Sequence, residues 1–142
     1  MNQDIPEGFS PHFRKSGMTD PWEPLYSRNT GDAIFLGLRA GPAHANSRGF
    51  VHGALITALA DNAMGLSCGL KLEGATGLVT VGVSVDFIAT ARLGQWLEIR
   101  PVVLKSGRNL SFCAATVHAS DTLCARANAT FRALMSEKSP TS

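Results

Sequence analysis

The feature that most constrains this fold is a long run of mostly small and apolar residues between Phe50 and Leu72. The run contains no proline, and it is too long for a β-strand, which usually spans about 3–10 residues. We therefore predict a helix that begins near His52 and ends around residues 69–73. A single helix with apolar faces must be covered by another layer of structure.

Strand-like segments supply that layer. One segment, Ala33–Arg39, precedes the helix, and four follow it: Leu78–Ile88, Trp96–Lys105, Leu110–Ala119 and Leu123–Leu134. Short polar connections at 106–109 and 120–122 favour hairpins between the last three. Alternation in the first of the four predicts one shared side for these residues: Val79, Val81, Val83, Val85 and Phe87.

The predicted fold class is α+β, with an antiparallel sheet wrapped around one central helix. The main domain spans residues 33–136, and a tail spans residues 137–142. Residues 1–32 contain four prolines and are predicted to form an irregular lead-in with room for one short helix. One helix covers only one face of the sheet, so we expect the chain to form an oligomer.

Composition excludes several classes of protein. The 142 residues suit one domain, and a formal net charge of +2 with scattered basic residues argues against nucleic-acid binding. We expect neither a signal peptide nor a membrane span, because no stretch reaches roughly 20 consecutive apolar residues. The expected location is cytoplasmic. All three cysteines lie in apolar segments and are predicted to be buried thiols: Cys68, Cys113 and Cys124.

Asp61 is a candidate catalytic residue on the predicted helix. It is the only acidic residue between Val51 and Leu70. On a helical wheel it lies about 120° from the stripe expected to face the core, which consists of Leu55, Leu59, Leu66 and Leu70 with Asn62 among them. A solvent-facing carboxylate is the alternative, but a solvated face normally carries several charges. We expect Asp61 to be partly desolvated, which would strengthen it as a general base.

The start of the helix is a second candidate site. Residues 49–54 show no side-chain cap, so free backbone N–H groups and the helix dipole could hold developing negative charge. Gly53 would let a substrate approach the backbone, although Gly49 and Gly53 could simply help the chain turn.

These two candidates cannot act on one carbonyl within a single chain. The helix rises about 12 Å from Gly53 to Asp61, whereas both groups would have to lie within about 3 Å of the substrate. Either the two features are unrelated, or the site forms between two subunits.

Three stretches resemble the hotdog-fold acyl-CoA thioesterases. They are PAHANSRGFVHGALITALADNAMG (42–65), GVSVDF (82–87) and LKSGRNLSF (104–112). The similarity runs from about residue 33 to 134, and the branch it resembles most contains the phenylacetate-pathway and 4-hydroxybenzoyl-CoA thioesterases. The resemblance implies homodimers with two shared active sites, commonly paired into homotetramers. It also implies hydrolysis of an aryl or medium-chain acyl-CoA to a free acid and coenzyme A.

The resemblance also implies roles for individual residues. Asp61 would be the general base or nucleophile, and the backbone N–H of Gly53, beside His52, would polarise the thioester carbonyl. Asn46 would position the thioester or the water, and Ser84 would hold the attacking water on the partner side. The sequence departs from the family at Ala54, where His-Gly-Gly is usual, and we expect this to change the shape of the pocket.

Coenzyme A carries phosphates, so a cationic surface is expected near the site. In related enzymes a polar turn lies beside the nucleotide, and here that turn consists of Lys105, Ser106, Gly107, Arg108 and Asn109. An ordinary solvated turn is the alternative. The histidines form no recognisable ligand spacing with the cysteines, so the sequence predicts no metal and no cofactor apart from the coenzyme A of the substrate.

Two other functions remain open from the sequence. A hotdog-fold hydratase or dehydratase would act on similar substrates, but such enzymes usually pair a histidine base with an acid in a different motif. A non-catalytic acyl-CoA-binding module would keep the sheet and the pocket without needing Asp61.

Overall fold

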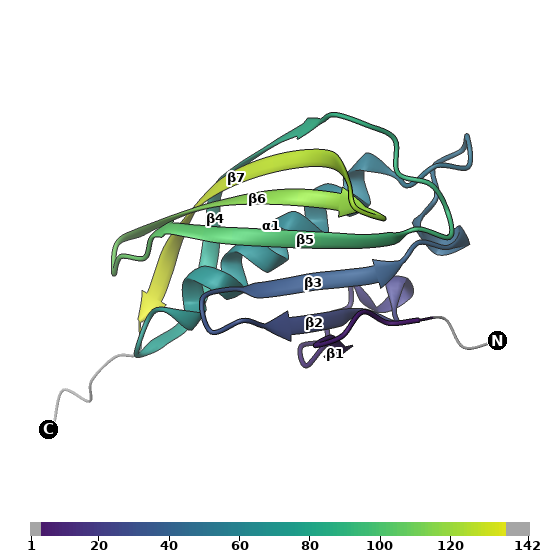
Figure 1. Cartoon of the computed structure of the whole chain (residues 1–142). Helices are drawn as coiled ribbons and strands as arrows, with labels where there is room; N and C mark the ends of the chain where they lie inside the picture. The colour runs from purple at the N-terminus through teal and green to yellow at the C-terminus, as the bar shows by residue number, and fades with distance from the viewer. Residues whose placement is uncertain (1–3, 136–142) are drawn as a thin grey trace, which may run out of the picture.

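A seven-stranded antiparallel sheet curves around one helix in the computed structural model, which describes residues 4–135 (Figure 1). The helix, α1, spans Gly53–Leu70. The long strands are β3 (Ile34–Arg39), β4 (Ala75–Phe87), β5 (Trp96–Lys105), β6 (Leu110–Ala119) and β7 (Thr122–Met135). These elements occupy the predicted segments, so the hotdog fold of a sheet around one central helix is confirmed.

The order of the strands in the sheet is β1-β2-β3-β5-β6-β7-β4. β5, β6 and β7 are joined by the predicted hairpins. β4 instead pairs with β7, so the chain between β4 and β5 crosses from one edge of the sheet back to its middle. β4 is therefore an edge strand that pairs with only one neighbour within the described residues.

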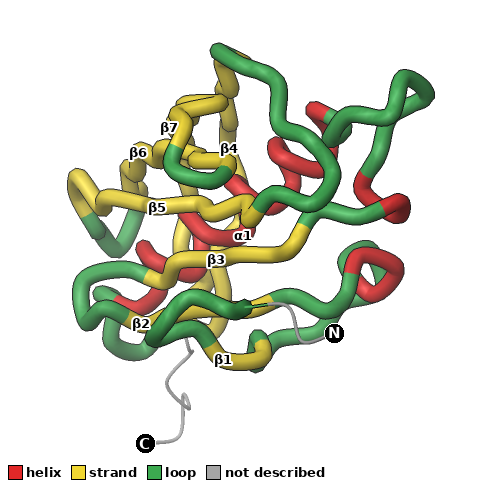
Figure 2. The backbone as a smooth tube through the Cα atoms, turned by 45° about the vertical axis from the view of Figure 1, so that its right-hand side comes forward, coloured by secondary structure: helices red, strands yellow, loops and turns green. Residues whose placement is uncertain are grey.

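The lead-in is more regular than predicted. It contains two short strands, β1 (Ser10–Pro11) and β2 (Tyr26–Asn29), and β2 pairs with β3, so the lead-in extends the sheet (Figure 2). The expected short helix is the 3₁₀ turn η1, Asp20–Trp22; a second, η2, spans Pro42–His44. β2 lacks an alternating apolar pattern because it is short, which is why the sequence did not reveal it. The predicted tail, 137–142, lies outside the described residues.

The core lies between α1 and the concave face of the sheet. Leu55 and Leu59 are buried as predicted, but Leu70 is 41% exposed and Asn62 is exposed. The buried face of the helix continues instead through smaller residues and one methionine: Ile56, Ala60, Ala63 and Met64. α1 is long and apolar enough, by length and composition alone, to cross a membrane, yet its buried residues pack against the sheet.

A bulge changes the predicted alternation of β4. Thr80 pairs with Phe131 and Gly82 pairs with Thr130, so Val81 has no partner on β7. Because Phe131 is buried, Thr80 faces the helix. After the bulge the parity reverses, so Val83, Val85 and Phe87 face inward. The prediction that Val79 and Val81 lie on the same side as these three residues is therefore wrong.

Candidate functional site

Asp61 is half-buried on α1 and receives a hydrogen bond from the facing strand. The Thr80 hydroxyl of β4 donates to Asp61 Oδ1 at 2.7 Å. Both residues line a cavity of about 450 Å³ between α1, β4 and the N-terminal segment. The helix contributes five further residues to the same cavity: Asn62, Gly65, Leu66, Gly69 and Leu70.

Thr80 was missed by the sequence reasoning, which chose Ser84 as the hydroxyl near the site. Ser84 pairs with the exposed Asn128 and lies after the bulge, so it sits on the outer face of the sheet, away from Asp61. The two segments VTV and VSV look alike. Only the extra residue at Val81, which carries no clear sequence signal, decides which hydroxyl faces the helix.

The start of α1 is capped, contrary to the prediction. His52 is the N-cap residue, and its Nδ1 accepts a hydrogen bond from the N–H of Ala54 at 3.0 Å. An imidazole lone pair thus replaces the oxygen of the usual capping side chains. The N–H of Gly53 has no acceptor within residues 4–135, so it stays available to a ligand.

Gly53 also has a packing reason to be glycine. A Cβ atom at this position would lie 3.0 Å from Cζ of Phe87. The ring of Phe87, at the end of β4, therefore lies against the backbone at the helix start. Access for a substrate is thus not needed to explain this glycine.

Asn46 orders the loop that leads into the helix. Its Oδ1 accepts hydrogen bonds from the N–H groups of Arg48, at 2.9 Å, and Phe50, at 3.1 Å. The N–H of His52 donates to the backbone oxygen of His44 at 2.8 Å. The predicted residues Asn46, His52 and Gly53 therefore lie together at the start of the helix, about two turns from Asp61.

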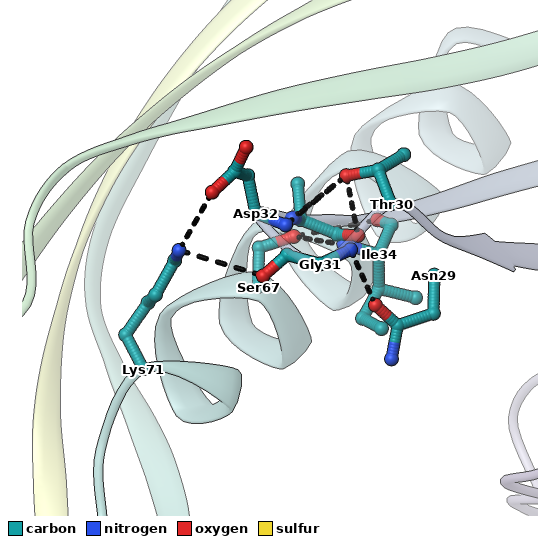
Figure 3. A network of polar contacts seen from close by, with 8 residues as sticks. Asn29, Thr30, Gly31, Asp32, Ile34, Ser67 and Lys71 are labelled. Atoms are coloured by element: carbon teal, nitrogen blue, oxygen red, sulfur yellow. Dashed lines mark hydrogen bonds and ion pairs between the residues drawn. The ribbon is translucent and has the colours of Figure 1, made fainter.

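The other half of α1 is fixed to the β2–β3 hairpin (Figure 3). The buried hydroxyl of Ser67 accepts a hydrogen bond from the N–H of Ile34 at 2.9 Å and donates to the Ala63 oxygen at 2.7 Å. Lys71 forms an ion pair with Asp32 at 3.0 Å. Because Ser67 and Lys71 lie on either side of Gly69, these contacts hold the C-terminal half of α1, which lines the cavity, in position.

The polar turn 105–109 lies beyond the C-terminal half of α1. Ser106 Oγ donates to the Cys68 oxygen at 3.0 Å, and the N–H of Gly107 donates to Ser111 Oγ at 3.1 Å. Lys105, Arg108 and Asn109 are exposed. The turn is thus separated from both Asp61 and Gly53 within one chain. Residues 4–135 contain no group of three or more His, Cys, Asp or Glu side chains placed to hold a metal.

Comparison with known proteins identifies the family. The model of the thioesterase superfamily matches residues 48–125. A protein of Pseudomonas aeruginosa described as a putative esterase is 36% identical over 129 residues, which cover 90% of this chain and 96% of that protein. Mouse acyl-coenzyme A thioesterase 13 is 30% identical over 115 residues, covering 80% and 81% of the two chains.

A solved structure shows the same fold. A Streptococcus mutans protein, crystallised bound to acetyl CoA, superposes with a TM-score of 0.68 at 23% identity, covering 75% of this chain and 85% of that one. The structure agrees with the helix and the sheet described above, and the family model covers more than half of the chain. The chain therefore belongs to the thioesterase superfamily and is a thioester hydrolase.

Proposed function

We propose that the protein hydrolyses aryl or medium-chain acyl-CoA thioesters at two sites shared by a homodimer. Asp61 of one subunit acts on the thioester whose carbonyl oxygen is held by Gly53 of the other. The observation that carries this proposal is the Asp61–Thr80 pair at a cavity, with an unpartnered Gly53 N–H on the same helix. The mouse relative's name and the acetyl CoA in the Streptococcus mutans structure support acyl-CoA as the substrate class.

The chemistry needs a base and an oxyanion donor. With Asp61 as general base, a water oxygen attacks the carbonyl carbon while the carboxylate takes its proton. The oxyanion then collapses, the C–S bond breaks, and the coenzyme A thiolate recovers the proton. A positioned base typically contributes about 10²–10⁴-fold, and one oxyanion donor about 3–4 kcal/mol. If Asp61 attacks the carbonyl carbon directly instead, coenzyme A leaves as the thiolate and water hydrolyses the resulting anhydride. The positions of Asp61 and of the Gly53 N–H relative to the thioester are the same in both routes.

The edge strand β4 suggests how the two subunits meet. Thr80 of β4 contacts Asp61, and Phe87, further along β4, contacts the start of α1. β4 is therefore antiparallel to α1. Antiparallel pairing of two such edges would therefore bring the start of one helix toward Asp61 of the other. Val79 and Val81 are 49% and 62% exposed, and an apolar unpaired edge favours pairing with another strand.

The remaining candidates take supporting roles in this proposal. The amide nitrogen of Asn46 would bind the thioester or the water, since its oxygen already holds the loop. Lys105 and Arg108 would contact the phosphates of coenzyme A. The predicted tetramer would need a second surface, and the outer face of the sheet offers the exposed Val102, Leu104 and Phe112.

A thiol-release assay with a range of aryl and alkyl acyl-CoA substrates tests the catalytic roles. We expect Asp61→Asn to lower turnover by at least about 100-fold without loss of folding. Gly53→Pro removes the proposed N–H donor, and proline is well tolerated at the first position of a helix. Gly53→Ala is the matched control, because it meets Phe87 in the same way but keeps the N–H. We expect activity to be retained in Gly53→Ala and lost by about 100-fold in Gly53→Pro.

Co-expression of Asp61→Asn with Gly53→Pro tests whether the site is shared. A mixed dimer has one site with both defects and one intact site, so about a quarter of wild-type activity should return. No recovery would indicate that the two groups do not act together across subunits. Binding of acyl-CoA by the wild type without release of thiol from any substrate would favour the non-catalytic module.

A further inference from the structure

The cavity beside Asp61 has one wall that the hydrolysis does not use. This wall is the N-terminal cover, which we define as residues 11–25. Several contacts within the cover fix its conformation. The N–H of His12 donates to the Leu25 oxygen at 2.9 Å, Lys15 pairs with Glu23 at 3.1 Å, and the Ser16 and Thr19 hydroxyls bond to each other at 2.8 Å. The cover is thus an ordered part of the cavity.

His12 is the unusual residue of this wall. The residue lines the cavity, although it is only 6% exposed. Its Nδ1 is buried and has no hydrogen-bond partner. Desolvation lowers the pKa of His12, and the nearby Lys15 and Arg14 lower it further, against an opposing effect of Glu23. The ring is therefore mainly neutral near pH 7.

The buried Nδ1, which has no hydrogen-bond partner, indicates which tautomer the neutral ring adopts. A buried N–H without an acceptor is rarer in proteins than an unsatisfied lone pair, so the proton belongs on Nε2 and Nδ1 carries the lone pair. Nε2 is not among the buried atoms that lack a partner, and it forms no hydrogen bond with residues 4–135. A residue that lines the cavity thus carries a hydrogen-bond donor that no described residue satisfies.

The helix side of the cavity is packed closely at its glycines. Gly65 and Gly69 line the cavity together with Asp61, and an added Cβ would lie 3.3 Å from the Phe131 ring at Gly65 and 3.5 Å from Leu78 at Gly69. The volume of about 450 Å³ falls in the usual range of small-molecule pockets. The cavity could therefore hold an acyl group whose thioester lies beside Asp61.

We propose that His12 determines specificity for the acyl group. Its Nε2–H donates a hydrogen bond to an oxygen atom that the acyl group carries away from the thioester. The favoured substrates are then acyl groups with a distal hydroxyl or carbonyl oxygen, over unsubstituted ones of the same length. This inference rests on the function proposed above, because it places the thioester at Asp61.

Matched pairs of substrates test the inference with the full-length protein. One pair is hexanoyl-CoA and 6-hydroxyhexanoyl-CoA, and the other is 3-phenylpropanoyl-CoA and its 4-hydroxyphenyl derivative. Hydrogen bonding should give the wild type a kcat/KM about tenfold higher for the hydroxylated member of at least one pair. His12→Leu should abolish that preference mainly by slowing the hydroxylated substrate. His12→Gln, whose amide can place a donor near the position of Nε2, should keep part of it and covers the case in which His12→Leu fails to fold.

His118→Leu is the matched control. His118 also has a sealed, unpartnered Nδ1, and burial also lowers its pKa, but it lies on β6 and does not line the cavity. We expect it to keep the wild-type preference. Equal turnover of both members of each pair by the wild type, or an undiminished preference in His12→Leu, would overturn the inference while leaving the proposed function intact. If the wild type hydrolyses none of the four, the proposed function fails as well.

Discussion

At the scale of single residues, the carboxylate of Asp61 depends on its one hydrogen-bond donor from β4. The Thr80 hydroxyl, at 2.7 Å from Oδ1, restrains the orientation of the carboxylate and leaves Oδ2 free to face a water or a carbonyl carbon. A hydrogen bond to a charged group contributes about 1.5–3 kcal/mol. Thr80 is thus a positioning residue whose loss should affect turnover more than folding.

We predict that Thr80→Val lowers kcat by about tenfold or more while KM changes little, because an apolar group of the same shape cannot orient the carboxylate. Thr80→Ser should restore most of the activity. Steady-state kinetics of thiol release measures both. Ser84→Ala serves as the control, since Ser84 lies on the outer face, and a loss in Ser84→Ala with an active Thr80→Val would reverse the assignment.

At the scale of elements, α1 and the sheet enclose all three cysteines. Cys68 comes from α1, Cys113 from β6 and Cys124 from β7, and each is a buried free thiol. The hydrogen bond with Cys68, together with burial, raises the pKa of Cys113. Burial also raises the pKa of Cys124. The reactive thiolate form of Cys113 and Cys124 is therefore disfavoured. The hydrogen bond with Cys113 lowers the pKa of Cys68, but Cys68 is fully buried and thus shielded from reagents.

We predict that the native protein shows almost no reaction with a thiol reagent over the minutes of an activity assay, whereas three thiols react after unfolding in denaturant. Absorbance of the released chromophore counts them. Fast reaction of one thiol in the native state would mean that the layers open locally on that timescale. The prediction also has a practical side, because the thiol-release assay then reports coenzyme A alone.

The same elements show what the sequence could and could not predict. β5 and β6 were predicted with their observed bounds, because short polar turns and alternating residues specify hairpins locally. Asp61 and the helix start could be predicted as candidate site residues, because a lone carboxylate and an N-terminal glycine are visible in the residue pattern. The histidine cap was missed because histidine is not among the usual capping residues, and β2 was missed because it is too short for an alternating pattern. The bulge at Val81 was missed because it depends on pairing with β7, which is distant in sequence.

At the scale of the whole molecule, β4 forms an open edge of a long sheet. Alternation within a strand does not specify which strand becomes the edge, so only the fold revealed that β4 pairs with β7 alone. The proposed dimer would close this edge and complete both sites. Activity and assembly should therefore be lost together.

We predict that Val81→Lys gives a folded monomer with thiol-release activity reduced by about 100-fold, since a lysine on a strand edge opposes pairing with another strand. Size-exclusion chromatography with light scattering gives the mass, and circular dichroism checks the fold. Leu104→Lys is the control, because Leu104 is similarly exposed, at 66%, but lies on β5 at the surface proposed for the tetramer, so this variant should keep the dimer and its activity. A fully active Val81→Lys monomer would refute the shared site.

The bulge divides β4 into two stretches of opposite parity. The stretch before Val81 presents Thr80 to the Asp61 carboxylate, and the stretch after it places Phe87 against the helix start. Deleting Val81 would reverse the orientation of the side chains before it, so Thr80 would face outward. The side chains after it would keep their orientation. The insertion thus separates the part of β4 that evolution can vary to alter chemistry from the part that it must preserve for folding.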